Sequence, residues 1–153
     1  MVILLYAFLL GIVGGLRSMT APAVVCWGAH LGWLHLQGSP LAFLANKISL
    51  VIFSLFALVE LIADKLPFIP PRTQAGPLVV RIVFGAMCGA ALCFSVAASP
   101  LWGALLGGLG GIVGAFAGYA YRRRFGLTVP DLLLALFEDL VAVGGGLLLV
   151  SHL

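Results

Sequence analysis

Three carboxylates lie inside long apolar stretches of the sequence, where an ionised group is costly. Glu60 ends the stretch LFALVE, and Glu138 and Asp139 lie within LLLALFEDLVAV. An acidic side chain in the middle of a bilayer costs at least about 2.5–3.5 kcal/mol unless it is paired or hydrated. Such acids indicate either a transport site or a salt-bridge network that holds helices together, and the sequence leaves both interpretations open.

A second polar interruption, RSMTAP at residues 17–22, separates two apolar segments near the N-terminus. Thr20 is expected to cap a helix that has proline in its first turn. The free N–H groups at the start of that helix, together with Arg17 and Ser18, would suit an anion. The anion is a substrate in one interpretation, and one of the chain's own intramembrane glutamates in the other.

The predicted binding site joins this helix junction to the acids. Glu60 and Glu138 are its paired carboxylates. Asp64 shares a helix face with Glu60, and Asp139 adjoins Glu138, so that both are expected to tune them. A low dielectric favours a protonated acid, which leaves proton coupling open. The predicted substrate- or ion-binding residues are Arg17, Ser18, Thr20, Glu60, Asp64, Glu138 and Asp139. The three cysteines have no metal-binding spacing, and we expect neither a metal nor a cofactor.

The composition indicates the solvent in which these elements fold. Of the 153 residues, 63% are hydrophobic and 8% are charged, whereas soluble domains carry about 25% charged residues. Such a chain cannot cover a water-facing surface. We therefore expect an all-α integral membrane protein with a single transmembrane domain over residues 1–153 and the lipid bilayer as its partner. The net charge of +3 comes from scattered basic residues, which argues against binding of nucleic acid.

About six helices are expected to cross the membrane, since one crossing needs about 20 predominantly apolar residues. Proline and glycine clusters separate the segments. The predicted segments are Val2–Leu16, Thr20–Leu36, Lys47–Leu66, Leu78–Ala98, Leu101–Tyr121 and Pro130–Ser151. The first two are short, and they form either two full crossings or a re-entrant pair.

The basic residues predict the orientation of these helices. When the connections are assigned to alternating sides, seven of the eight Lys and Arg residues fall on one side. Basic residues accumulate on the cytoplasmic face of a membrane. The expected location is therefore the bacterial inner membrane, with both termini in the periplasm. The seven residues are Arg17, Lys65, Arg72, Arg81, Arg122, Arg123 and Arg124, and Lys47 lies on the other side.

The two halves of the chain share a short pattern. LFALVE at residues 55–60 matches LLALFE at 133–138, an offset of 78 residues. Halves of about 1–75 and 76–153 would each contain three helices, and an odd number inverts the second copy, as in many secondary transporters. Chance similarity between leucine-rich helices is the alternative.

Glycines dominate the segment 101–121. They recur every third or fourth residue in a pattern called a glycine zipper, which lets helix backbones approach closely in lipid. The segment is expected to be the central packing element or the interface of a homodimer. One row consists of Gly103, Gly107 and Gly111, and the other of Gly110, Gly114 and Gly118.

Several motifs, in the same order along nearly the whole chain, resemble one family of small bacterial membrane proteins known only as a domain of unknown function. The motifs are GLRSMTAP, ELIADKLP, RTQAGPL, GAFAGYAYRRR and VPDLLLALFEDLVAVGGGLLLV. A threonine-valine pair stands before the proline at Thr128–Asp131, where the family pattern suggests leucine. The resemblance implies a polytopic inner-membrane protein and implies no activity.

The residues therefore favour a small inner-membrane transporter with a carboxylate–arginine site and an unknown small-molecule or ionic substrate, which is expected to be anionic. The alternative is a scaffold, lipid-binding or assembly protein whose buried charges are structural. An enzyme is the weakest hypothesis, because the chain has no HExxH motif and no nucleophile–histidine pair.

Overall fold

Helices account for almost all of the regular structure in the computed structural model, which describes residues 1–63 and 74–153. No strand occurs among these residues. Asp64, which was predicted to belong to the site, lies outside the described residues, as do Lys65 and Arg72. The helices are α1 (Val2–Leu16), α2 (Thr20–His30), the short 3-10 helix η1 (Ala42–Ala45), α3 (Lys47–Ala63), α4 (Ala75–Ser95), α5 (Pro100–Phe125) and α6 (Asp131–Ser151).

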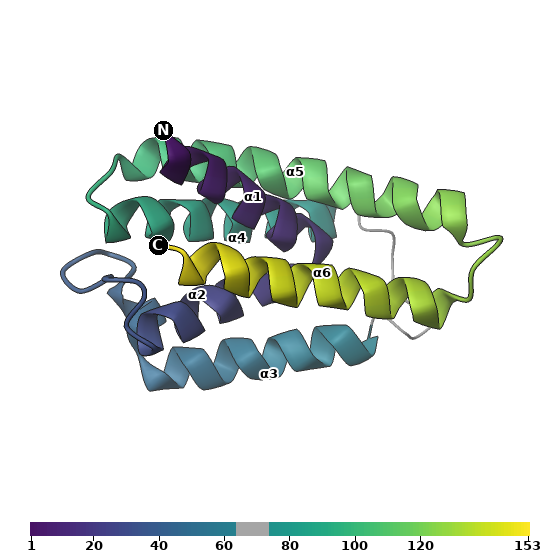
Figure 1. Ribbon diagram of the computed structural model, residues 1–153, viewed down its shortest axis with the longest axis horizontal. Coiled ribbons are helices and arrows are strands. Elements are labelled where there is room, and N and C mark those ends of the chain that lie inside the picture. The colour runs from purple at the N-terminus through teal and green to yellow at the C-terminus, as the bar shows by residue number, and fades with distance from the viewer. Residues whose placement is uncertain (64–73) are drawn as a thin grey trace.

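The long helices lie roughly along one axis, and successive helices run in opposite directions (Figure 1). Both termini therefore lie at the same end of the bundle. The helices α1, α4 and α5 pack tightly on one another, whereas α2 packs on α3 and α6. The helix α3 packs mainly on α2 and lies at the edge of the bundle (Figure 1).

Glycines create the tight packing of α5. A Cβ atom added at Gly107 would strike the backbone carbonyl of Gly85 on α4, and one added at Gly114 would strike that of Ile12 on α1. Added Cβ atoms at Gly103, Gly107 and Gly111 would meet the backbone of α4, and those at Gly110 and Gly114 would meet the backbone of α1. The predicted glycines Gly103, Gly107, Gly110, Gly111, Gly114 and Gly118 are all buried. These glycines therefore pack within the single chain.

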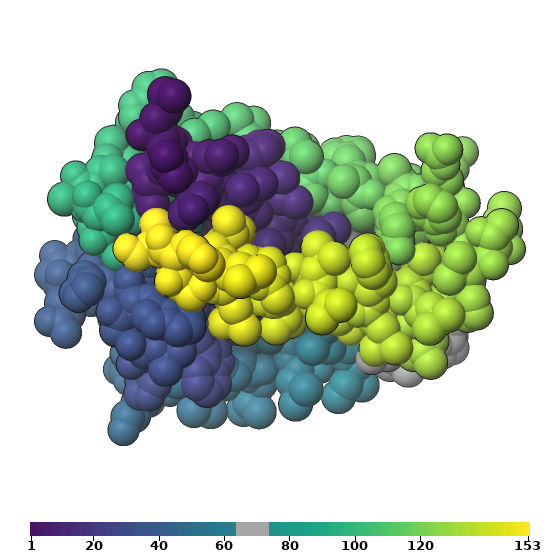
Figure 2. Space-filling view, viewed as in Figure 1, coloured from purple at the N-terminus to yellow at the C-terminus, as the bar shows by residue number. Residues whose placement is uncertain are grey.

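Three of the helices in the described part of the chain, α4, α5 and α6, are long and apolar enough to cross a membrane, and α1 is a shorter apolar helix. The outer surface is apolar too. The helix α6 forms much of the face seen in Figure 2. The exposed apolar side chains of α6 include Leu132, Leu133, Leu136, Phe137 and Leu140. A soluble monomer rarely exposes so large an apolar surface. These features are those of an α-helical membrane protein.

The prediction of a helix up to Leu36 is wrong, because α2 ends at His30. Gly32 has a φ of +82°, which a helix cannot continue through. The backbone N–H of Trp33 turns back to the carbonyl of Gly28 at 2.8 Å, and the chain then runs irregularly to η1. The pair of helices α1 and α2 is therefore short, with 15 and 11 residues.

Candidate functional site

The break between α1 and α2 binds a carboxylate, and that carboxylate is Glu60 of α3. The backbone N–H and the hydroxyl of Ser18 donate to Glu60 Oε1 at 2.8 and 2.7 Å. The backbone N–H of Met19 donates to Glu60 Oε2 at 2.9 Å. Arg17 has an extended backbone, which ends α1 and leaves these N–H groups without a partner in α1. Both oxygens of one carboxylate therefore occupy the N-terminus of α2, where the helix dipole favours negative charge.

Arg17 extends this junction to α6. Its side chain is fully buried, and it donates to Asp139, whose side chain is 15% exposed. The junction thus contacts Glu60 of α3 through Ser18 and Met19, and Asp139 of α6 through Arg17. Arg17 pairs with Asp139. Asp139 was predicted to tune Glu138 and was not predicted to be the partner of Arg17.

Arg81 also belongs to this cluster, although the sequence did not predict it. It was assigned to a cytoplasmic connection, yet it lies within α4 and is 6% exposed. Its Nη1 donates to the carbonyl of Gly15 at 2.6 Å, and its Nη2 lies 3.9 Å from Glu60 Oε1. Arg81 therefore satisfies a carbonyl at the end of α1 and adds positive charge beside Glu60. Its position inside an apolar helix was the signal that could have identified it.

Glu138 lies in a second ion pair. Its carboxylate is almost fully buried and accepts a hydrogen bond at 3.1 Å from the Nε of Arg122, near the end of α5. Arg122 was predicted to be a cytoplasmic topology residue, and a quarter of its side chain is exposed. The pair links the last turns of α5 to the first half of α6. Glu60 and Glu138 thus bind different groups, the helix junction in one case and Arg122 in the other.

Thr20 does not cap α2 as predicted. The N-cap position is Met19, whose own side chain makes no cap hydrogen bond. Thr20 is the first residue of the helix, is 3% exposed, and its hydroxyl has no hydrogen-bond partner among the described residues. The carboxylate of Glu60 takes over the role of the cap from a distant helix.

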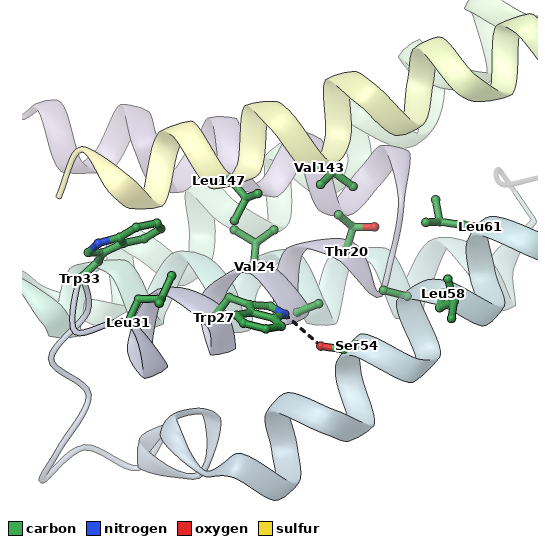
Figure 3. A pocket seen from close by; sticks show the side chains of 12 residues that line it. Thr20, Val24, Trp27, Leu31, Trp33, Ser54, Leu58, Leu61, Val143 and Leu147 are labelled. Carbon is green, nitrogen blue, oxygen red and sulfur yellow. Dashed lines mark hydrogen bonds between the residues drawn. The ribbon is translucent and has the colours of Figure 1, made fainter.

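A pocket with a volume of about 420 Å³ lies between α2, α3 and α6 (Figure 3). Trp27 projects into it from α2, and its Nε1 donates to Ser54 Oγ of α3 at 3.1 Å. Ten of the lining residues have apolar or tryptophan side chains, and the two others carry hydroxyls. The lining consists of Thr20, Ala23, Val24, Trp27, Leu31, Trp33, Ser54, Ala57, Leu58, Leu61, Val143 and Leu147.

The comparison with family models decides the relationship that the motifs suggested. A model described as a domain of unknown function, DUF4126, matches residues 4–152. The chain belongs to the DUF4126 family. No curated protein and no solved structure matches this DUF4126 chain. The resemblance predicted from the sequence is therefore confirmed, and the residues themselves must carry any statement about function.

The chemistry that this DUF4126 site offers is recognition of a carboxylate. Among the described residues, no group of three or more His, Cys, Asp or Glu side chains could hold a metal ion. The cluster combines two backbone N–H groups, a serine hydroxyl and the buried Arg81 guanidinium around the carboxylate of Glu60. This combination binds anions through charge-assisted hydrogen bonds.

Proposed function

We propose that this DUF4126 protein is a small permease for carboxylate-bearing anions and that Glu60 occupies its substrate site in the closed state. The observation that carries the proposal is the set of three hydrogen bonds from Ser18 and Met19 to the two oxygens of Glu60. A substrate carboxylate could make the same bonds once the side chain of Glu60 has moved away.

The surrounding charge supports this exchange. Arg81 lies 3.9 Å from the glutamate, and Arg17 is buried next to the junction. With Glu60 displaced, the N–H groups at the N-terminus of α2 would still favour negative charge, and Arg81 would still lie beside the vacated carboxylate position. An incoming proton on Glu60 would weaken its hold on the N–H groups, so proton-coupled exchange is the expected mode.

The position of α3 supports a movable glutamate. This helix lies at the edge of the bundle and packs mainly on α2 and η1. Its outward side chains are exposed, including those of Val51, Leu55 and Val59. Few protein contacts would therefore be lost if α3 tilted away from α2. Loss of the Trp27–Ser54 hydrogen bond would accompany the movement.

The wider architecture that we propose has six crossings in two inverted three-helix halves. The alternating helix directions and the common end of both termini support it (Figure 1). The proposed orientation places both termini in the periplasm of a bacterium with this protein in its inner membrane. A homodimer through the exposed apolar face of α5 belongs to the same proposal.

The test compares the native protein with Glu60→Ala and Glu60→Gln. Acetate should raise the thermal midpoint of detergent-solubilised Glu60→Ala clearly more than that of the native protein, because the small anion replaces the missing side chain. Glu60→Gln keeps a side chain at the helix junction, so acetate should change its thermal midpoint little. Val59→Ala, at an exposed neighbouring position, is the matched control. Proteoliposomes containing native protein should take up labelled acetate. Absence of both uptake and the acetate response would refute the proposal.

A structural role for the charges is the second candidate, and the two other ion pairs favour it. Arg17 and Asp139 tie the α1–α2 junction to α6, and Arg122 and Glu138 tie α5 to α6. In a scaffold or lipid-binding protein, replacing these residues would reduce stability while no solute crosses the membrane. Uptake by native protein in the proteoliposome experiment separates this candidate from the permease.

A further inference from the structure

We infer that the apolar pocket and the Glu60 site form one binding site for a carboxylate that carries a hydrocarbon tail. The inference rests on the proposed function and specifies its substrate class. In this arrangement, the carboxylate replaces that of Glu60 at Ser18 and Met19, and the tail lies in the pocket between α2, α3 and α6.

The chain brings the two parts together on both helices. Thr20 lines the pocket and directly follows Met19, whose N–H binds Glu60. On α3, the pocket residue Leu61 directly follows Glu60. The pocket residue Ala57 lies three residues before Glu60, on the same helix face. The end of the pocket at Thr20 and Leu61 is therefore next to the carboxylate position (Figure 3).

The pocket lining selects a hydrocarbon group. Its side chains are mainly those of alanine, valine and leucine, with two tryptophans, and the hydroxyl of Ser54 is already bonded to Trp27. Burial of apolar ligand surface against such walls is favourable, whereas a polar group would lose its hydration without a partner. A small hydrophilic acid would leave this space unused.

Thr20 places a hydroxyl group at the end of the pocket that adjoins the carboxylate position. Its side chain is buried, its hydroxyl has no partner among the described residues, and its oxygen points towards the Leu61 side of the pocket in Figure 3. An unbonded buried hydroxyl costs free energy that a ligand oxygen can recover. A bound carboxylate at the neighbouring N–H groups would supply an acceptor at this end.

The dimensions fit a tail of moderate length. The pocket volume of about 420 Å³ lies within the range of about 300–1,000 Å³ that ligand sites occupy. From Thr20 to Leu31 the axis of a regular helix rises by about 16 Å. The tail would follow α2 in this direction, between α3 and α6. Because apolar side chains surround the bundle, such a ligand could enter sideways from the bilayer.

A chain-length series tests the inference. Acetate, butyrate and octanoate are titrated against Glu60→Ala, with methyl octanoate as an uncharged control, and the midpoint concentration for thermal stabilisation is measured. The midpoint should fall about three- to fourfold for each added methylene, the factor for moving a methylene from water into an apolar site. Methyl octanoate should bind far more weakly than octanoate.

Filling the pocket provides the matched comparison. In the Glu60→Ala background, Ala57→Phe should abolish the gain from octanoate while leaving the response to acetate intact. Val59→Phe, two residues along α3 but exposed, should preserve the gain. Bromo-octanoate should quench tryptophan fluorescence, and the double variant Trp27→Phe with Trp33→Phe, which replaces both tryptophans of the pocket, should remove most of that quenching. If Ala57→Phe fails to fold, the quenching measurement tests by itself whether the tail binds in the pocket.

The failures of the two proposals differ. An acetate response without any chain-length dependence, together with no quenching by bromo-octanoate, would overturn the tail site and leave the carboxylate permease standing. No response to any carboxylate would overturn this inference, and no response together with no uptake by proteoliposomes would overturn the proposed function as well.

Discussion

Arg17 and Asp139 form a buried ion pair across 122 positions of the sequence, which joins the α1–α2 junction to α6. The same junction holds Glu60 of α3 through its next two residues. One short break between helices therefore fixes the positions of two helices that lie far apart in the chain. Charged groups, which are costly in lipid, here determine which helices meet.

Removal of Arg17 alone should destabilise the fold strongly. Arg17→Met leaves Asp139 without its Arg17 bond, and loss of one partner of a buried pair costs about 3 kcal/mol or more. The double variant Arg17→Met with Asp139→Leu should recover part of this loss, since the acid that lost its bond to Arg17 is also removed. Thermal and denaturant unfolding in detergent would measure the effect.

The matched control for this cycle is Arg124→Met, because Arg124 is exposed. It should change stability by less than about 1 kcal/mol. Equal losses for Arg17→Met and Arg124→Met would contradict a stabilising role for the buried pair.

Gly107→Ala should be among the most damaging small substitutions in the protein. The added methyl group meets a backbone carbonyl of α4, which cannot move aside as a flexible side chain can. Overpacking of this kind costs about 1–3 kcal/mol, and we expect the upper end of that range. The measurement is the unfolding free energy in detergent or the amount of folded protein in the membrane.

Gly144→Ala is the appropriate comparison for Gly107→Ala. Gly144 also lies within a long helix, but a Cβ atom there would have no neighbour within 4 Å. Alanine should leave the stability unchanged or raise it by up to about 1 kcal/mol through helix propensity. If both glycines tolerated alanine equally, close approach of α4 and α5 at Gly107 would be disproved.

Helix positions were the part of the fold that the sequence could predict. All six α-helices begin within three residues of the predicted starts, because proline, glycine and polar clusters separate the long apolar runs. The exception in length is α2. Its predicted segment contains Gly32, and a single glycine cannot be recognised in advance as a turn with positive φ. The number of membrane crossings and the inverted repeat remain predictions.

The residues of the cluster were easier to predict than their partners. A buried acid is conspicuous in an apolar sequence, which is why Glu60, Glu138 and Asp139 were identified. Pairing depends on how helices rotate and cross, and one sequence contains no record of that. Arg81 was overlooked because the positive-inside rule offered a simpler explanation for a basic residue near a helix end. Burial distinguishes a basic residue at the membrane face from one inside the cluster, and burial is a property of the packed bundle.

The ion pair of Arg122 and Glu138 should respond unequally to removal of its two members. Glu138 is 3% exposed, whereas Arg122 is 26% exposed and can reach solvent or lipid headgroups. Arg122→Gln should therefore destabilise the protein more than Glu138→Gln does, since it removes a counter-charge from the more deeply buried group. Unfolding curves of both variants and of Arg123→Gln, at an exposed position, would establish the order. Equal effects would mean that burial of Glu138 does not govern this pair.

Accessibility of single cysteines should reveal the orientation in the membrane. The loop that follows α2 and the loop between α5 and α6 lie at opposite ends of the bundle (Figure 1). Gln37→Cys and Thr128→Cys place a thiol at an exposed position in each loop, and the three native cysteines are buried and should label poorly. Because three arginines precede the second loop, we expect Thr128→Cys to face the cytoplasm. A membrane-impermeant maleimide should label Gln37→Cys in intact cells and Thr128→Cys only after permeabilisation. Labelling of both from one side would contradict a bundle that spans the bilayer along its long axis, whereas a reversed pattern would contradict only the orientation drawn from the basic residues.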